Sequence, residues 1–225
     1  MKKIKVVMTL MLTTLLFRPA SAQQLAPLGN EIGNGGGMLH CHNNYGEFYA
    51  QFFDEYEAED RYRYGIKHAA IGSKNLMEIS LAYLRRLESL DADLFAKASA
   101  YLRDFNNEAL YLAHEYVLTV PDIGFGFIPK NCSYVQLVVQ KNPTYPHDQR
   151  YWISYDDWKL LNSQQQAMVL VHEVLFRRAR ELTANLTSSE GLRHFVALII
   201  SDQVSLLDEK GYLKWKKLAG LSQSK

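Results

Sequence analysis

Apolar residues recur every three or four positions along several stretches of the chain, and this spacing is typical of amphipathic helices. Polar residues that can cap a helix precede most of these stretches, and before the last two the pattern is that of a capping box. The expected caps are Ser73, Asp91 or Asp93, Ser163 with Gln166, and Thr187 with Glu190. The expected helices cover residues 45–56, 73–87, 91–105, 163–178 and 187–199.

The first expected helix, residues 45–56, is rich in aromatic side chains. A helical spacing places its six rings on one stripe, which favours packing in the core over a surface that binds sugars or peptides. The carboxylates of this segment then fall on a solvated face. The rings are Tyr45, Phe48, Tyr49, Phe52, Phe53 and Tyr56, and the carboxylates are Asp54, Glu55 and Glu57.

The middle of the chain is instead rich in β-branched and aromatic residues, bounded by Pro and Gly. Strands are expected at residues 116–120 and 133–140, and residues 151–154 would return as a partner strand. The whole pattern predicts an α+β fold, a predominantly helical single domain with a small antiparallel sheet of two or three strands.

The N-terminus has the three parts of a secretory signal peptide. Lysines precede an apolar run of 12 residues, and an A-x-A cleavage site ends at Ala22. Because a membrane span needs ~20 residues, we expect cleavage after Ala22 and no integral membrane segment after processing. The predicted organisation is a signal peptide at 1–22, a flexible Gly-rich arm at 23–40 and a single globular domain at 41–225, located in the periplasm or secreted.

Processing also changes the charge balance. The full chain has a formal net charge of +1, whereas loss of residues 1–22, which hold four basic and no acidic residues, leaves −3. A near-neutral surface lacks the basic face that nucleic acids need. We therefore expect no nucleic-acid partner, and an unknown protein or envelope component instead.

Cys41 and Cys132 are the two cysteines of the chain. An even pair in an exported protein favours a disulfide, which would fasten the Gly-rich arm to the domain. The alternative joins Cys41 to its neighbours His40 and His42 as metal ligands, a set that an oxidising compartment disfavours.

The helix expected at 163–178 is the segment that could carry chemistry. Apolar residues surround His172 and Glu173 on nearly all sides, so this helix is expected inside the core. A buried carboxylate must be paired, hydrogen-bonded or protonated, because burying it alone costs several kcal/mol. Arg177, one turn further on, and Arg193, from the next helix, can supply partners. The four residues are predicted to form one buried polar cluster.

Three motifs follow one another in the C-terminal half: a C-x-x-x-Q-L strand at 132–137, a His-Glu-x-x-Phe-Arg helix at 172–177 and a Ser-x-x-x-Arg helix start at 189–193. Together with the signal peptide, the Gly/Asn-rich start before a Cys and a Trp-bearing turn, this order resembles a group of uncharacterised exported proteins from predatory Gram-negative bacteria. Phe176 stands where the pattern of the group has Tyr, so this chain lacks a hydroxyl there. The resemblance implies the order of elements and the disulfide, and no particular activity.

These observations favour a structural or interaction module of the envelope or the secreted fraction, without a cofactor. The alternative is a degenerate zinc-metallopeptidase-like hydrolase, in which Glu173 is the candidate catalytic residue and acts on a metal-bound water. Phe176 occupies the position of the second zinc ligand, so His194 or His114 would have to complete the site with His172. A metal-free hydrolase, with Glu173 beside a Ser or His, is a further alternative, although the chain has no G-x-S-x-G motif.

Overall fold

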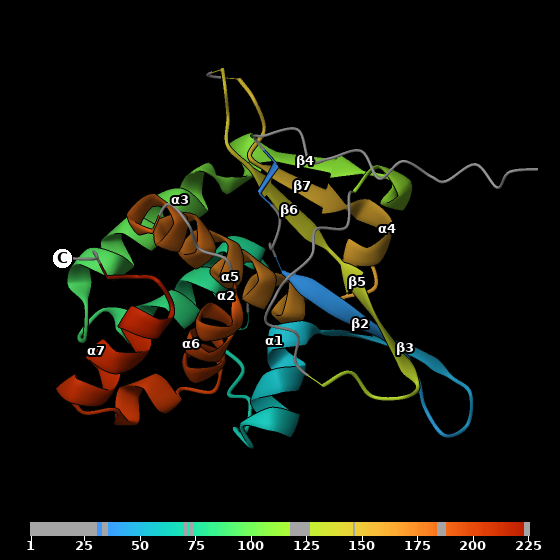
Figure 1. Ribbon diagram of the computed structural model, residues 1–225, viewed down its shortest axis with the longest axis horizontal. Coiled ribbons are helices and arrows are strands. Elements are labelled where there is room, and N and C mark those ends of the chain that lie inside the picture. Colours follow the sequence, from blue (N-terminus) through green and yellow to red (C-terminus); the bar gives the residue numbers. More distant parts are fainter. Residues whose placement is uncertain are drawn as a thin grey trace, which may run out of the picture.

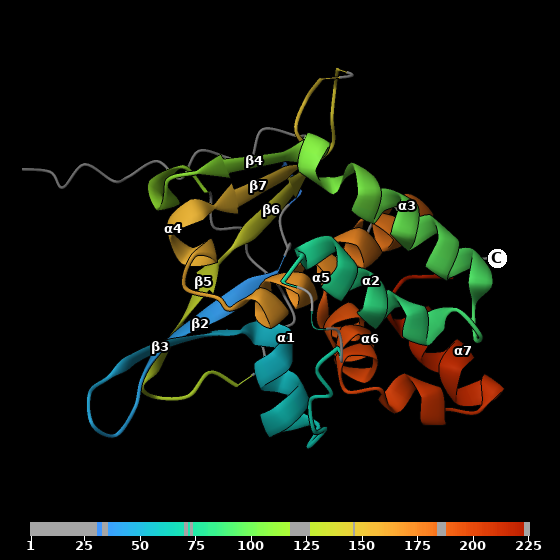
Figure 2. The ribbon, with the colours of Figure 1, turned by 180° about the vertical axis from the view of Figure 1, so that it is seen from behind.

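The two ends of the molecule differ in secondary structure. Strands form two small sheets at one end, and helices fill the other (Figures 1 and 2). The computed structural model describes residues 31–32, 36–69, 72, 74–117, 127–145, 147–183 and 188–222. The predicted signal peptide lies outside these residues. The predicted α+β class is confirmed, as a single domain in which helices predominate.

One sheet has the strand order β1-β6-β7-β4. Its strands are β1 (Glu31–Ile32), β6 (Val138–Lys141), β7 (Tyr151–Ser154) and β4 (Ala109–Leu112). β7 pairs antiparallel with β6, as expected of a returning strand, whereas β4 pairs parallel with β7. The sequence pattern does not predict β4, which directly continues a long helix and finds its partner only across a crossover.

The other sheet is fully antiparallel, with β2 (Gly37–His42) between β3 (Phe48–Phe52) and β5 (Cys132–Gln136). Cys41 lies opposite Cys132 in register, and the two form the predicted disulfide, which is compatible with an oxidising compartment. The predicted arm at 23–40 extends too far, because residues 37–40 belong to β2, where pairing on both sides and burial of Met38 and Leu39 order the chain.

The strand predicted at 133–140 is two strands in different sheets, β5 and β6. The chain crosses between the sheets at Leu137, where the carbonyl of Gly36 accepts hydrogen bonds from the backbone N–H groups of Leu137 and Val138. An apolar run buried on both sides gives no sign of this break. The strand predicted at 116–120 begins within a 3-10 turn, η3 (His114–Tyr116), and residues 118–120 lie outside the described residues.

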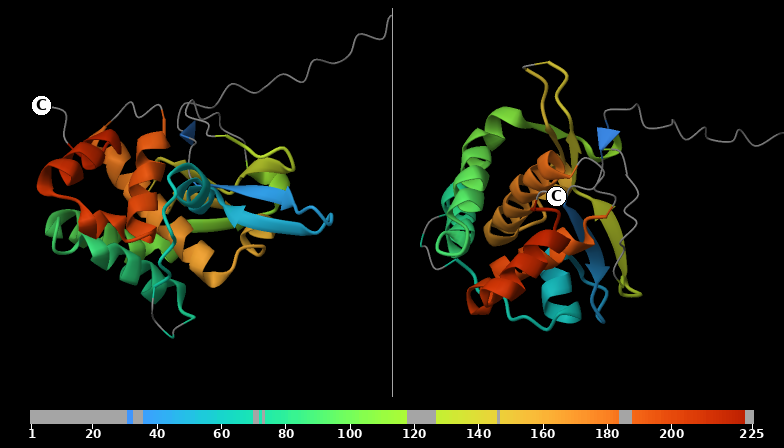
Figure 3. Two further views of the ribbon diagram at one scale, coloured as in Figure 1. Left: turned by 90° about the horizontal axis from the view of Figure 1, so that it is seen from below. Right: turned by 60° about the vertical axis from the view of Figure 1, so that its left-hand side comes forward.

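A long helix, α5, is at the centre of the helical half. It lies between α3 and the α6–α7 pair (Figure 3) and also packs on α2 and β3. Its first four turns are buried almost all round, as its apolar sequence predicts. The helices are α1 (Phe53–Tyr56), a π-helical turn η1 (Glu57–Arg61), α2 (Leu76–Leu84), η2 (Arg85–Leu87), α3 (Ala92–Glu108), α4 (Tyr155–Trp158), α5 (Ser163–Leu182), α6 (Glu190–Ile200), η4 (Gln203–Leu206) and α7 (Glu209–Leu218).

Side-chain caps fix the starts of the main helices. Asp91 caps α3 as predicted, and its other oxygen accepts hydrogen bonds from Tyr212 and Lys216 of α7. The capping box of α5 uses Asn162 and Gln165, one residue earlier than predicted, because the helix includes Ser163. The predicted caps Ser73 and Thr187 lie outside the described residues; Asn75 caps α2, and α6 follows Ser189 without a side-chain cap.

The aromatic helix predicted at 45–56 is wrong over most of its length, because residues 48–52 form β3 and only residues 53–56 form α1. Pairing with β2 satisfies the backbone of this segment and overrides its helical spacing. The prediction of solvated carboxylates is wrong too. Asp54, Glu55 and Glu57 are all buried, since the chain turns inward at α1 and places them against α5 and α6.

Candidate functional site

His172 is paired with a carboxylate that its own helix does not supply. Its Nδ1 lies 2.6 Å from Oδ2 of Asp54 in α1, and both side chains are closed off from solvent, with 1% and 0% exposed. Burial by itself lowers the pKa of His172, but the charge and hydrogen bond of Asp54 outweigh burial and raise it. The short contact and the raised pKa both favour the protonated form of His172 beside Asp54.

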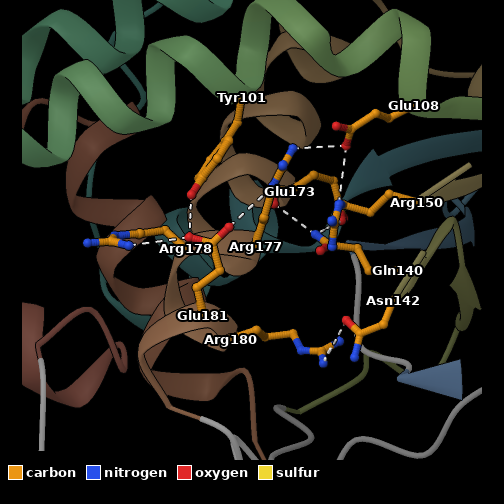
Figure 4. Close-up of polar contacts among 10 residues, drawn as sticks. All are labelled: Tyr101, Glu108, Gln140, Asn142, Arg150, Glu173, Arg177, Arg178, Arg180 and Glu181. Atoms are coloured by element: carbon orange, nitrogen blue, oxygen red, sulfur yellow. Dashed lines mark hydrogen bonds and ion pairs between the residues drawn. The ribbon is translucent and has the colours of Figure 1, made fainter. Parts of the chain in front are cut away.

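Glu173 is held by the segment before β2 and by β6. Its Oε1 accepts a hydrogen bond from the backbone N–H of Gly36, and its Oε2 accepts one from Nε2 of Gln140 at 2.6 Å (Figure 4). The same Gln140 amide donates to the backbone carbonyl of Glu173 at 2.7 Å. A Cβ on Gly36 would lie 3.2 Å from Oε1 of Glu173, so the carboxylate can reach this backbone because no side chain intervenes.

Burial raises the pKa of Glu173. Nearby His172 and the hydrogen bonds from Gly36 and Gln140 oppose this shift without cancelling it. Glu173 is fully buried, and its two oxygens are occupied by amide donors. Glu173 therefore connects α5 with β6 and with the segment before β2, and neither of its oxygens is exposed to a substrate.

Arg193 reaches the same buried region from α6. Its Nε donates to Oε2 of Glu57 at 2.7 Å, and its Nη1 donates to Oγ of Ser189 at 2.5 Å. In a parallel contact, Gln165 of α5 donates to Glu55 at 2.7 Å. The three buried acidic residues of α1 and η1, Asp54, Glu55 and Glu57, are therefore each bound by a residue of α5 or α6.

Arg177 makes its own set of contacts, apart from those of Glu173 (Figure 4), and its side chain is 13% exposed whereas Glu173 is fully buried. Its Nη1 donates to Glu108 at 2.9 Å, its Nε lies 3.5 Å from Glu181, and its guanidinium carbon is 3.9 Å from the ring centroid of Tyr101. Arg150 also donates to Glu108. The structure brings His172, Glu173 and Arg193 into one region, with acids and amides from other elements between them, and places Arg177 at the α3–α5 contact.

The three candidate zinc ligands do not meet at one site, and each contacts a different partner. His172 is bound to Asp54, and His114 lies 2.6 Å from Asp157. The ring of His194 lies between those of Tyr62 and Trp215, each at a centroid distance of 3.8 Å, and burial lowers its pKa to about 4. Among the described residues, no group of three or more His, Cys, Asp and Glu side chains is arranged to hold a metal ion.

A second polar centre surrounds Asp157 of α4, where the two sheets approach each other. His114 Nδ1 lies 2.6 Å from its Oδ2, His40 Nε2 lies 3.1 Å from its Oδ1, and the hydroxyl of Ser154 donates to it. Sequence reasoning does not find this centre, because its residues come from β2, η3, β7 and α4. The remaining nitrogen of His114 is available for contacts, since the side chain is 57% exposed.

The chemistry open to the two centres differs. The His172–Glu173 centre is enclosed, and both oxygens of Glu173 already accept hydrogen bonds, so it stabilises the contacts among α1, α5, α6 and β6. Oδ1 of Asp54 and Nε2 of His172 are buried in it without a hydrogen-bond partner among the described residues. The Asp157 centre orients an exposed imidazole by its Nδ1 and leaves Nε2 able to donate or accept a hydrogen bond. Ser154 faces the carboxylate rather than an imidazole, which is not the arrangement of an activated serine nucleophile.

Comparison with protein-family models, with curated proteins and with solved structures finds no match. Within the described ranges, no helix has both the length and the apolar composition that crossing a bilayer requires. The fold and the two polar centres therefore define the class of this protein. It is an α+β domain with one disulfide between β2 and β5 and an enclosed network of polar contacts in its helical half.

Proposed function

We propose that this protein is an exported module that works through surface contacts, in the periplasm or outside the cell. In this proposal the polar residues of α5 and α6 hold the fold together, and the sheet half of the molecule meets the partner. The N-terminal sequence with its cleavage site after Ala22 supports export, as does the Cys41–Cys132 disulfide. The order of motifs supports a relation to the exported proteins from predatory bacteria.

The observation that carries this proposal is the complete burial of His172 and Glu173 with partners from other elements. A hydrolase would present these groups to a substrate. The zinc alternative requires a second ligand one helical turn after His172, and Phe176, buried at that position, offers none.

Exposed aromatic side chains support a contact surface on the sheet half. Among the described residues, every aromatic side chain that ranks as exposed lies on a strand, on a sheet connection or on the short elements that follow β4 and β7, whereas the exposed large residues of the helical half are leucines. Tyrosine and phenylalanine are enriched where proteins bind partners, because they bury a large area at a small entropic cost. The aromatic residues are Tyr45, Phe48, Tyr49, Tyr111, Tyr116, Phe127, Tyr145 and Tyr155.

The structural role of the α5 network predicts that His172→Ala lowers the melting temperature by roughly 6 °C or more, because Oδ2 of Asp54 is left buried without its hydrogen-bond partner. The matched control is His147→Ala, at an exposed position, which we expect to leave the melting temperature within about 1 °C. Metal analysis of both proteins after exchange with zinc should give less than about a tenth of an equivalent. Unchanged stability of His172→Ala, or stoichiometric zinc lost in that variant, contradicts the proposal.

The contact surface predicts where a partner can be cross-linked in cells of the source organism. A photoreactive side chain at Tyr45, on the turn between β2 and β3, should give a discrete adduct, because this side chain is 90% exposed on the sheet half. The same group at Leu213 in α7, which is also exposed, should give none. Equal labelling from both positions, or none from either, argues against a contact surface on the sheets.

A further inference from the structure

β3 is an outer strand of the antiparallel sheet. It pairs with β2 along one side, and among the described residues no strand pairs with its other side. Figures 2 and 3 show the hairpin of β2 and β3 projecting from the body of the molecule. Soluble proteins usually protect an exposed edge with charged side chains or Pro, because its unpaired backbone groups can bind another strand. β3 reads Phe-Tyr-Ala-Gln-Phe over residues 48–52 and contains neither.

The hydrogen-bond pattern of the hairpin shows which backbone groups of β3 point outward. The N–H of Asn43 donates to the carbonyl of Glu47 at 2.9 Å, so these two residues form a hydrogen-bonded pair. Hydrogen-bonded and non-hydrogen-bonded pairs alternate along an antiparallel ladder. In the register of β3 with β2, the backbone of Tyr49 therefore bonds to β2, whereas the N–H and C=O groups of Phe48 and Ala50 point away from it.

The other side of β2 confirms this pattern. The N–H of His42 donates to the carbonyl of Asn131, the residue before β5, at 3.0 Å. It therefore points toward β5 and away from β3. This direction is required if His42 and Phe48, which lie opposite each other, form a non-hydrogen-bonded pair.

β3 is also more accessible than β5, the other outer strand of this sheet. The side chains of Phe48 and Tyr49 are 47% and 45% exposed, and Ala50 is half-buried. On the outer side of β5, the N–H of Cys132 already donates to the carbonyl of Pro129 at 3.0 Å. A further strand can therefore add to the sheet at β3.

The sequence of β3 is complementary to itself in an antiparallel pair with a two-fold axis at Tyr49. In this register Phe48 lies opposite Ala50 of the second copy, so the outward N–H and C=O groups of the two residues bond to each other. A large ring then lies beside a methyl group. The two Tyr49 side chains form a non-hydrogen-bonded aromatic pair, the arrangement in which side chains are closest. Glu47 falls opposite Gln51, which is uncharged, so like charges do not face each other.

The same register covers the turn of the hairpin. Tyr45, with 90% of its side chain exposed, falls opposite Phe53 of the second copy, where α1 begins. The two sheets then form one continuous antiparallel sheet in the order β5-β2-β3-β3-β2-β5. Three of the exposed aromatic residues of the sheet half, Tyr45, Phe48 and Tyr49, thus lie along one contact.

We propose that β3 is the interface of a homodimer, in which two copies of this chain pair edge to edge at Tyr49. This inference rests on the proposed function and names the partner of the sheet half. The outward backbone groups of Phe48 and Ala50 carry it, because an extended polypeptide strand offers the alternating donors and acceptors that satisfy such an edge. Self-complementarity around Tyr49 favours a second copy over an unrelated strand.

The test is sedimentation equilibrium of the processed, disulfide-bonded protein with charged variants at the two-fold axis. The wild type should dimerise with a Kd of about 100 μM or below. Tyr49→Lys and Tyr49→Glu should each raise this Kd by about tenfold or more, because like charges then lie opposite each other. An equal mixture of the two variants should dimerise again, since opposite charges then meet at the axis.

Tyr145→Lys, at an exposed position between β6 and β7, is the matched control and should dimerise as the wild type does. The four proteins should melt within about 2 °C of one another at a concentration where all are monomeric, because the substituted side chains are exposed. The Tyr45 adduct should contain two copies of this chain.

A wild type that stays monomeric up to about 1 mM overturns the inference. Tyr49 variants that dimerise as the wild type does, or a mixture of the two that stays monomeric, overturn it as well. A monomeric wild type whose Tyr45 adduct contains a different protein excludes the second copy and leaves the contact function intact. Absence of both dimer and adduct removes the contact function too.

Discussion

Gly191→Ala will lower the free energy of unfolding by about 3 kcal/mol, and the melting temperature by roughly 6–12 °C. Gly191 lies in the first turn of α6, directly against the end of α7. A Cβ at this position would lie 2.0 Å from the carbonyl oxygen of Leu218 and 2.6 Å from its carbonyl carbon. Because these are backbone atoms, no side-chain rotation relieves the overlap, and α7 must move away from α6.

Gly65→Ala is the matched control, since a Cβ there would have no neighbour within 4 Å. Thermal and urea unfolding of the two variants give the comparison. Equal stability of Gly191→Ala and Gly65→Ala would show that the close approach of α7 to α6 does not exist in solution. A loss confined to Gly191→Ala supports the packing of the C-terminal helix.

Glu173→Ala will have a second large effect, with a loss of about 3 kcal/mol or more. The substitution leaves the N–H of Gly36 buried without its acceptor, removes one of the two acceptors of the Gln140 amide, and opens a cavity in the centre of the fold. Glu173→Gln is the matched variant. It retains an acceptor for Gly36 and the side-chain volume, so we expect a smaller loss.

The two variants also separate the charge of Glu173 from its hydrogen bonds through the pH dependence of stability. Because burial raises the pKa of Glu173 in the folded state, the unfolded chain ionises first as pH rises. The stability contributed by this group is full below the ordinary pKa of 4.5 and is lost as pH rises through the folded pKa. Glu173→Gln should not show this loss. The difference in free energy of unfolding between the wild type and Glu173→Gln should therefore shrink toward neutral pH.

Urea unfolding at a series of pH values measures this difference. If the free energies of unfolding of the wild type and Glu173→Gln differ by the same amount from acidic to neutral pH, Glu173 has the same pKa in the folded and unfolded chains. A Glu173→Ala variant as stable as the wild type would place the carboxylate in solvent and would reopen a catalytic role for it.

The centre of the helical half could be predicted from the sequence because its signal is local. Residues 167–176 are apolar on nearly every side of the helix, and this pattern alone predicts that α5 lies in the core. Periodicity likewise predicts α3 with its Asp91 cap, and the returning strand β7. The identity of the partners was not predictable, since Asp54 and Gln140 are far from Glu173 and His172 along the chain and reach them only through α1 and β6.

The segment at 45–56 shows where local spacing fails. Its rings recur at three and four positions, yet the chain there pairs with β2, whose neighbours on both sides satisfy its backbone and whose Cys41 is joined to β5. Long-range pairing of this kind adds hydrogen bonds and burial that outweigh a helical preference of a few tenths of a kcal/mol per residue. His40 also belongs to β2, and its Nε2 lies 3.1 Å from Oδ1 of Asp157.

The sequence by itself determined which helix is interior, that a buried His–Glu pair needs partners, and that two cysteines form a bridge. Those conclusions depend on the nature of each side chain and its immediate neighbours. Only the tertiary structure decided which groups contact the pair, that Arg177 binds elsewhere, and that imidazoles of β2 and η3 meet at Asp157 of α4. The physical reason is that a hydrogen bond or ring contact requires atoms within a few ångströms, and distances between remote segments are set by packing of the whole chain.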